Sequence, residues 1–250
     1  MINHILLFWF LFIFIFDIYF YVKKNIIFYS VKFNRHWRNN FFNFALTKLL
    51  SLAIFVPVIL YASAHPLMNV INIVGGVTSI ILGVVVLDFI GYIFHRLCHK
   101  NKFMWRFHEI HHLDEVLDAT TGLRVHFFEL MLHTFFNFLI IWLLGISSES
   151  VLVHSIIGFI IAIFHHSKIR LPVNFEKKLS NFITTPRFHA PHHDKEYKNN
   201  NSNYAFIFPV WDRIFKTYHD KTFTQDWNYG LAYKQDVNML DSILSPFKKH

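Results

Sequence analysis

The sequence contains very little cysteine and little charge. Cys98 is the one cysteine among 250 residues, which excludes a disulfide framework, a cysteine-rich zinc fold and an iron–sulfur cluster held by cysteines of this chain. Charged residues make up 16%, against about 25% in a typical soluble domain. Together with 54% hydrophobic residues and a mean hydropathy of +0.33, this excludes an intrinsically disordered chain and favours a membrane protein.

Five apolar stretches have compositions suited to the membrane interior, at about residues 5–22, 44–64, 70–94, 130–146 and 151–164. A helix that crosses the hydrocarbon core needs about 20 residues. The first three stretches reach or approach this length. The last two are shorter and are joined by a polar turn, so we expect a tilted hairpin or a re-entrant pair. The sequence therefore predicts an all-α fold, a polytopic membrane helical bundle of four to five spans.

The positive charges indicate how the bundle is oriented. Lysine and arginine fall into three segments, with six in 23–48, five in 95–129 and thirteen from residue 168 onward. Because positive residues mark the cytoplasmic side, we expect the N-terminus outside and all three segments in the cytoplasm. The net charge of +8 then reflects topology and contact with anionic lipids, and no nucleic-acid partner is predicted. The first stretch lacks the basic start and cleavage site of a signal peptide, so we expect it to remain as an anchor.

Histidine is unusually frequent, with 18 residues against 16 Asp and Glu together. Three clusters have spacings of i, i+3 or i+4, which put the imidazoles on one helical face. Imidazole is a common ligand for iron, zinc and copper. Eight imidazoles exceed the four or so ligands of one zinc site, so two metal ions are predicted, held in the cytosolic helical cap. The clusters are His95 and His99; His108, His111 and His112; and His189, His192 and His193.

The order and spacing of these clusters resemble the fatty acid hydroxylase / sterol desaturase superfamily of integral-membrane di-iron oxygenases. The resemblance covers about residues 75–220. The segments that carry it run from Asp88 to His99, from His108 to His112, from Arg124 to Glu129, over 164–167, over 185–193, over 203–204 and over 211–218.

The resemblance implies two iron ions that activate O₂ to attack a lipid C–H bond, with zinc as a substitute that a purified preparation can contain. By position, it implies that the eight cluster histidines are ligands, with His166 as a ninth. His126 is a weaker candidate, as a ligand or a close neighbour.

Three charged residues near the clusters are candidate catalytic residues. Asp88 lies seven residues before His95, and an ionisable group inside a span is by default a functional candidate. It either orients a ligand histidine through its second ring nitrogen or makes a polar contact between spans. Arg124 and Glu129 flank His126, and we expect them to form a charged network around the ligands.

Several positions depart from the pattern of the superfamily, namely Phe127, Lys168, Pro191, Ala205 and Lys216. None removes a cluster histidine, so they bear on the substrate subgroup rather than on the metal centre. Proline is tolerated in a first helical turn but not in a helix interior. Pro191 therefore predicts that the helix of the third cluster begins near His189.

The other histidines are expected to have lesser roles. His154 precedes His166 by 12 residues, about 18 Å along a helix, and is rejected as a ligand. His133 either lines a pocket or packs in the core, and His165 is expected behind the ligands or in a pocket. Ordinary surface positions are expected for His4, His36, His65, His219 and His250.

The function predicted is that of an oxygenase which hydroxylates a fatty acyl, sterol-like or ether lipid drawn from the bilayer. Electrons would come from an external ferredoxin, cytochrome b5-like protein or reductase, because the chain shows no carrier motif. The residue bias suggests a bacterial inner membrane, with the endoplasmic reticulum as the alternative. We expect anchor spans in 1–69, the catalytic domain in 70–220 and a tail in 221–250.

Three other functions remain open at this stage. A desaturase would use the same centre, and a catalytically silent relative would hold zinc. A histidine-ligated metal transporter would place ligands at the membrane midplane, whereas these clusters collect at one predicted face.

Overall fold

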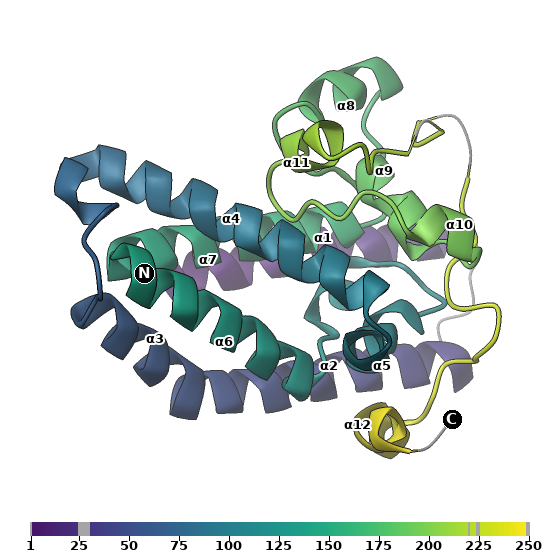
Figure 1. Cartoon of the computed structure of the whole chain (residues 1–250). Coiled ribbons are helices and arrows are strands. Elements are labelled where there is room, and N and C mark those ends of the chain that lie inside the picture. The colour runs from purple at the N-terminus through teal and green to yellow at the C-terminus, as the bar shows by residue number, and fades with distance from the viewer. Residues whose placement is uncertain (1, 25–30, 220, 224–225, 249–250) are drawn as a thin grey trace.

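The computed structural model describes residues 2–24, 31–219, 221–223 and 226–248. Over these residues the chain is built from helices and loops, with one isolated β-bridge between Asp194 and Tyr229 and no strand. Figure 1 shows the long helices running side by side, with the short helices gathered at one end. The predicted all-α bundle is confirmed. The prediction for His250 lies outside the described residues.

Five helices are long and apolar enough to cross a membrane. Their composition explains this, since each contains a long stretch rich in Phe, Ile, Leu and Val. The second candidate span is a continuous rod in which a π-helical turn precedes Pro57, a residue that cannot donate a backbone hydrogen bond. The spans are α1 (Ile2–Lys23); α2 (Val31–Leu50) with η1 (Ser51–Phe55) and α3 (Val56–Ala64); α4 (Gly76–Lys100); α6 (Phe127–Leu144); and α7 (Ser148–His166).

Three glycines at two turns explain where the observed spans differ from the apolar stretches. The third span begins at Gly76 rather than near residue 70, because Gly75 and Gly76 adopt positive φ angles of 65° and 53° that end the preceding loop. At the turn after α6, Gly145 has a φ of 69°, and an added Cβ would lie 2.6 Å from the Met68 carbonyl oxygen. Amino-acid composition alone predicts neither the positive φ angles nor the close contact at Gly145.

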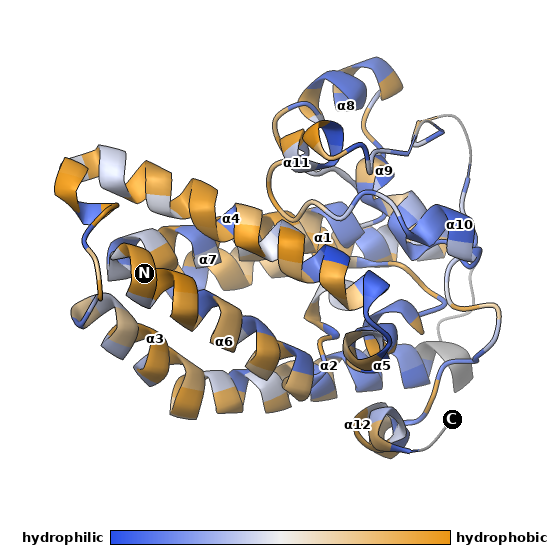
Figure 2. Cartoon of the chain, in the orientation of Figure 1, coloured by the Kyte–Doolittle hydropathy of each residue, from blue (hydrophilic) through white to orange (hydrophobic). Residues whose placement is uncertain are grey.

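Apart from the 3₁₀ turn between α3 and α4, which lies at the opposite end, the remaining elements are short and form a polar cap at one end of the bundle. In Figure 2 the hydrophilic residues concentrate in this cap, whereas the far ends of α3, α4 and α6 are hydrophobic. The elements outside the spans are η2 (Asn72–Val74), α5 (Lys102–His112), η3 (Ala119–Leu123), α8 (Val173–Leu179), α9 (Pro186–His189), η4 (Ala190–His193), α10 (Tyr197–Asn200), α11 (Val210–Ile214), α12 (Met239–Leu244) and η5 (Ser245–Phe247).

An aromatic contact seats the cap on α4. The Trp211 ring lies 4.9 Å from that of Phe89, and the Phe215 ring lies 5.5 Å from that of Tyr92. Asp88 adds a polar anchor here, because its carboxylate accepts a hydrogen bond from Trp211 Nε1 at 2.8 Å. The segment that carries the third histidine cluster is thereby held against the span that carries the first.

Candidate metal centre

The turn between α4 and α5 brings the first two histidine clusters together. Asn101 follows α4 and caps α5, because its side chain accepts hydrogen bonds from Phe103 N at 2.9 Å and Met104 N at 3.1 Å. Helix α5 therefore starts immediately and folds back. His108 then faces His95, with the two Nε2 atoms 3.1 Å apart.

The third cluster reaches the same place through two short helical turns. Thr185 caps α9 and Pro186 occupies its first turn, where a missing N–H costs nothing. The 3₁₀ turn η4 follows and holds Pro191. His189 is the N-cap of this turn and Pro191 lies in its first turn, so the predicted start near His189 is confirmed for the helical turn that holds Pro191, and α9 precedes it from Pro186.

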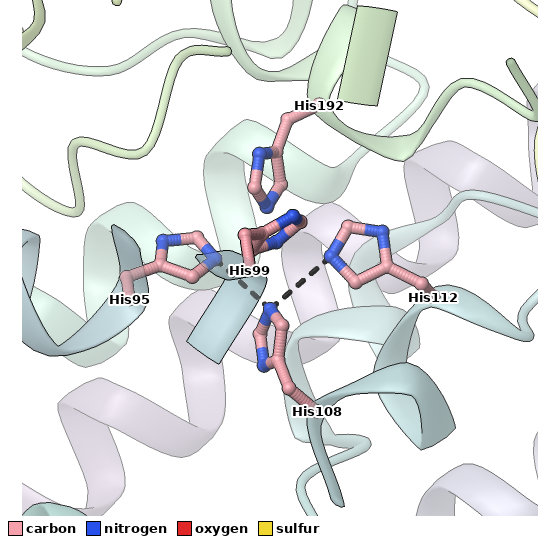
Figure 3. Close-up of side chains that lie close together, drawn as sticks. All are labelled: His95, His99, His108, His112 and His192. Carbon is pink, nitrogen blue, oxygen red and sulfur yellow. Dashed lines mark hydrogen bonds between the residues drawn. The ribbon is translucent and has the colours of Figure 1, made fainter. Parts of the chain in front are cut away.

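Nine buried or half-buried histidines form two adjacent groups of candidate ligand atoms, each within 4.8 Å of one another. Figure 3 shows the rings of the first group converging from α4, α5 and η4. The first group is His95, His99, His108, His112 and His192. The second group is His111, His166, His189 and His193.

The second and third clusters each contribute histidines to both groups. Residues four apart on a helix differ by about 40° in direction, whereas residues three apart diverge by about 60° to the other side. His108 and His112 accordingly enter the first group while His111 enters the second. In the third cluster His189 and His193, which are four residues apart, enter the second group, and His192 enters the first. One short motif thus contributes to two neighbouring sites.

The distances between ring nitrogens fit shared metal ions. The Nε2 atoms of His108 and His112 lie 3.2 Å apart, those of His111 and His166 3.3 Å, and those of His189 and His193 3.1 Å. Two ligands about 2.1 Å from one ion lie about 3.0 Å apart at a right angle and about 3.4 Å apart at the tetrahedral angle. The observed separations fall within this interval.

Most of these rings are oriented by a hydrogen bond on the opposite side. Nδ1 donates to a backbone oxygen in four of them: His95 to Tyr204 at 2.7 Å, His111 to Arg124 at 3.1 Å, His166 to Ala162 at 2.7 Å and His192 to Ser202 at 2.8 Å. A bond of this kind fixes the tautomer and leaves Nε2 free to bind a metal ion. In the described part of the chain, Nε2 of His99 and of His192 is buried without a hydrogen-bond partner.

Burial also keeps the cap imidazoles in the form that binds metal. Desolvation, followed by neighbouring imidazoles, holds the pKa of His111, His112 and His193 well below the usual value. The pKa of His189 and that of His192 are lowered for the same reasons. Neutral imidazole is the ligating form, so the residues present fit a pair of metal ions.

The three charged candidates lie around the groups rather than in them. Glu129 Oε1 accepts from His108 Nδ1 at 2.8 Å. Arg124 presents its backbone oxygen to His111, and its buried guanidinium pairs with Asp236. Asp88 accepts from the backbone N–H of Ile207 and Phe208 at 3.0 and 3.1 Å as well as from Trp211.

Two further histidines lie beside the groups. Both ring nitrogens of His126 are engaged elsewhere, with Nδ1 accepting from Phe128 N and Nε2 3.1 Å from the Ile243 oxygen. The His165 ring lies 4.2 Å from the His189 ring, and its Nδ1 contacts Thr184 Oγ1 at 2.9 Å. The structure therefore keeps His126 outside both groups and places His165 directly behind a member of the second.

The expectation that His36 is a surface residue was wrong. It is 1% exposed and lies between two carboxylates, with Nδ1 2.5 Å from Asp114 and Nε2 2.9 Å from Asp118. Burial alone would raise the pKa of Asp118, but the charge of His36 and its hydrogen bond lower that pKa below the usual value. The sequence shows two aspartates soon after His112, namely Asp114 and Asp118. Their partner His36 lies 78 and 82 residues earlier in the chain, so only the fold reveals the contact.

A cavity of about 930 Å³ lies among the spans. This volume is in the range of small-molecule sites. Leu123 and Leu130 line it near the cap, and Phe206 lines it beside His165, with ring centroids 6.2 Å apart. Leu152 lines it near the opposite end. Most of the wall is aliphatic or aromatic, which suits a hydrocarbon chain.

The family model for the fatty acid hydroxylase family matches residues 80–217, which include all nine histidines. The chain belongs to the fatty acid hydroxylase family. The resemblance seen in the motifs is therefore confirmed.

Individual relatives are lipid-modifying proteins by name. The chain is 27% identical over 172 residues to ornithine lipid hydroxylase OlsE of Rhizobium tropici, covering 68% of this chain and 51% of that one. It is 31% identical over 169 residues to human alkylglycerol monooxygenase, covering 68% and 35%. It is 27% identical over 136 residues to a cholesterol 25-hydroxylase-like protein of Danio rerio, covering 53% and 52%. No solved structure gives a significant match. The matched regions thus span about half or less of these relatives.

Proposed function

We propose that this protein is a membrane-bound di-iron oxygenase that hydroxylates a C–H bond of a lipid with O₂ and externally supplied electrons. The observation that carries the proposal is the combination of two adjacent histidine groups with an apolar cavity lined by Phe206, whose ring lies 6.2 Å from that of His165, which in turn lies 4.2 Å from that of His189. The named relatives are hydroxylases and monooxygenases of lipids, which supports the same class of reaction.

The two groups would hold one iron each, five imidazoles around the first and four around the second. When bound, such an iron pair supplies the O₂ activation and the oxidising power for attack on an unactivated C–H bond. The chain itself holds the imidazoles in their neutral tautomer through the backbone oxygens of Tyr204, Arg124 and Ser202. Asp88, Arg124 and Glu129 act here as positioning residues, and His126 is assigned no ligand role.

The cavity would align the lipid and keep water out. Its apolar wall binds the hydrocarbon chain through burial of apolar surface, and the chain enters sideways between the spans. Phe206 separates the cavity from His165, so the reactive end of the substrate would lie near the second histidine group. We place the polar cap on the cytoplasmic side of a bacterial inner membrane, following the positive charges, with 1–69 as anchor spans, 70–220 as the catalytic domain and 221–250 as a tail.

The metal content of the purified, detergent-solubilised protein tests the proposal. We expect about two iron ions per chain and O₂-dependent formation of hydroxylated lipid with a chemical electron donor, and His111→Ala should lose both iron and activity. His65→Ala is the matched control, because His65 is exposed and belongs to neither group. Protein without bound metal, or metal that His111→Ala leaves unchanged, would contradict the proposal. An olefinic product would assign desaturation instead.

A further inference from the structure

A second cavity, of about 630 Å³, lies in the cap and is lined by Trp105 of α5, Tyr197 of α10 and Tyr233. Tyr197 is 70% exposed and Tyr233 is 66% exposed, so the cavity opens to the surface. Figure 1 shows α10 and the segment that leads to α12 at the end of the molecule opposite the loop between α3 and α4. This cavity therefore lies at the end of the cap away from the spans, and it shares no lining residue with the apolar cavity.

Trp105 joins this surface cavity to the first histidine group. The centroid of its ring lies 4.8 Å from that of His99 and 5.3 Å from that of His112, and both histidines are members of the first group. The indole Nε1 donates to the Tyr233 hydroxyl at 2.8 Å, and this hydroxyl donates to Glu109 Oε2 at 3.0 Å. The indole is thereby held in one orientation, and a single half-buried side chain connects the surface to the ligand rings.

The surface around this cavity is positively charged. Lys195 and Lys198 line the cavity and are exposed, and Lys102 is exposed one turn before Trp105 on α5. Glu196 also lines the cavity and pairs with Lys198 at 2.8 Å. Three exposed lysines against one exposed glutamate leave a net charge of +2, which favours a partner with an acidic surface.

We propose that this surface docks a small acidic carrier protein that delivers one electron at a time, and that each electron reaches the first histidine group through Trp105. The inference rests on the proposed function and identifies the class of its electron donor. Hydroxylation of a C–H bond by O₂ takes up two electrons and two protons and yields the alcohol and one water. Two reduced carriers are therefore oxidised in turn for each product, and the indole provides the path without a net gain or loss of electrons.

The character of the surface favours a carrier protein over a lipid bilayer. The large exposed side chains that line the cavity are tyrosines and charged residues, whereas a surface that inserts into a bilayer presents Trp, Phe and Leu side chains. Encounters between redox proteins use small interfaces, below about 1,200 Å², and are steered by complementary charge. A compact basic surface with an aromatic path to the ligands suits such an encounter.

Equilibrium binding to the full-length protein in detergent tests the docking surface, with a plant-type 2Fe–2S ferredoxin as the acidic carrier. We expect the affinity to fall about tenfold as the ionic strength rises from about 0.01 M to about 0.15 M. Ferredoxin whose carboxylates are amidated should not bind. Lys195→Glu combined with Lys198→Glu should weaken binding at least about tenfold. Lys177→Glu combined with Lys178→Glu makes the same change of charge at exposed positions of α8 and should bind nearly as the wild type does.

Anaerobic reduction of the iron-loaded protein tests the route through Trp105. We expect Trp105→Leu to lose most of the rate of reduction by ferredoxin and a smaller share of the rate of reduction by dithionite, a small donor that does not need the docking surface. Trp105→Phe keeps an aromatic ring beside His99 and should lose less of the ferredoxin rate. A tryptophan that only packs against the ligands would change both rates alike.

Three results would overturn the proposal: no binding of ferredoxin by the wild type, equal losses of binding in the two lysine pairs, or equal slowing of both donors in Trp105→Leu. Reversal of Lys195 and Lys198 that leaves ferredoxin binding intact and weakens binding of phosphatidylglycerol would assign the surface to the bilayer and overturn it as well. Binding and anaerobic reduction are measured without lipid substrate. A protein that binds ferredoxin and is reduced through Trp105 but forms no hydroxylated lipid would therefore contradict the proposed function alone.

Discussion

Nδ1 of His108 donates to Oε1 of Glu129 across 2.8 Å, and this bond joins α5 to α6 at the edge of the first histidine group. The carboxylate fixes the ring so that Nε2 faces His95 and His112. A carboxylate behind a ligand imidazole orients it and raises its basicity. Glu129 thus links the cap end of α6, a membrane span, to the first histidine group.

Replacing Glu129 should therefore weaken metal binding. We expect Glu129→Leu to lower the affinity about 10–100-fold, the usual effect of losing such a partner, and Glu129→Gln to lower it less because an acceptor oxygen remains. Iron retained against a series of chelator concentrations measures this. Glu149→Gln is the control, since that exposed side chain lies at the other end of the bundle. Equal retention by Glu129→Leu and the wild type would show that the bond does not support the centre.

The division of the histidines into two groups predicts a pattern of metal loss. His99→Ala and His189→Ala should each lose about one ion, because each removes a ligand from a different group. The double variant of His99 and His192 alters one group and should lose no more than a single variant. The double variant of His99 and His189 should lose both ions. Metal analysis of the four proteins checks this, and equal losses in the two double variants would contradict the division.

His36 is predicted to stabilise the fold. His36→Ala leaves Asp114 and Asp118 buried without the cation between them, and removing one partner of a buried ion pair costs about 3–5 kcal/mol. Thermal unfolding in detergent measures the loss. His4→Ala, at an exposed position of α1, should unfold like the wild type.

The pH dependence of this effect follows from the lowered pKa of Asp118. A folded pKa below the unfolded value of about 3.9 contributes stability above that value, and the contribution is lost as the pH falls through the folded pKa. The difference in stability between wild type and His36→Ala should therefore be steady from about pH 5 to 7 and shrink below about pH 4. A difference that grows on acidification would contradict this assignment.

Asp88 is predicted to hold the segment that orients His95. Asp88→Leu removes the acceptor for Ile207, Phe208 and Trp211, so backbone amide exchange should rise over 204–211. Iron should be lost from the first group, because Tyr204 supplies the oxygen that fixes His95. Asp88→Asn keeps one acceptor oxygen and should show a smaller rise. Unchanged exchange in Asp88→Leu would remove Asp88 from this role.

The sequence by itself determined the helical class, the membrane spans and the composition of the histidine set. These features are local: apolar length marks a span, and spacings of three and four residues mark one face of a helix. For the same reason, spacing alone predicted the eight cluster histidines, and the resemblance to the family added His166 and, as a weaker candidate, His126. The structure brings the eight and His166 together in two groups and leaves His126 outside them.

Only the tertiary structure decided how those histidines divide, and which distant residues support them. Spacing separates His111 from its cluster neighbours His108 and His112, but which histidines of other elements join each of them depends on how α4, α5, α7 and η4 come together, which spacing along the chain does not encode. His36 and Asp118 are 82 residues apart. Nothing in the sequence around an isolated histidine in a polar stretch indicates that it is buried. The cavity likewise exists only where several spans meet. Burial and long-range pairing depend on packing, and packing is fixed when the whole chain folds.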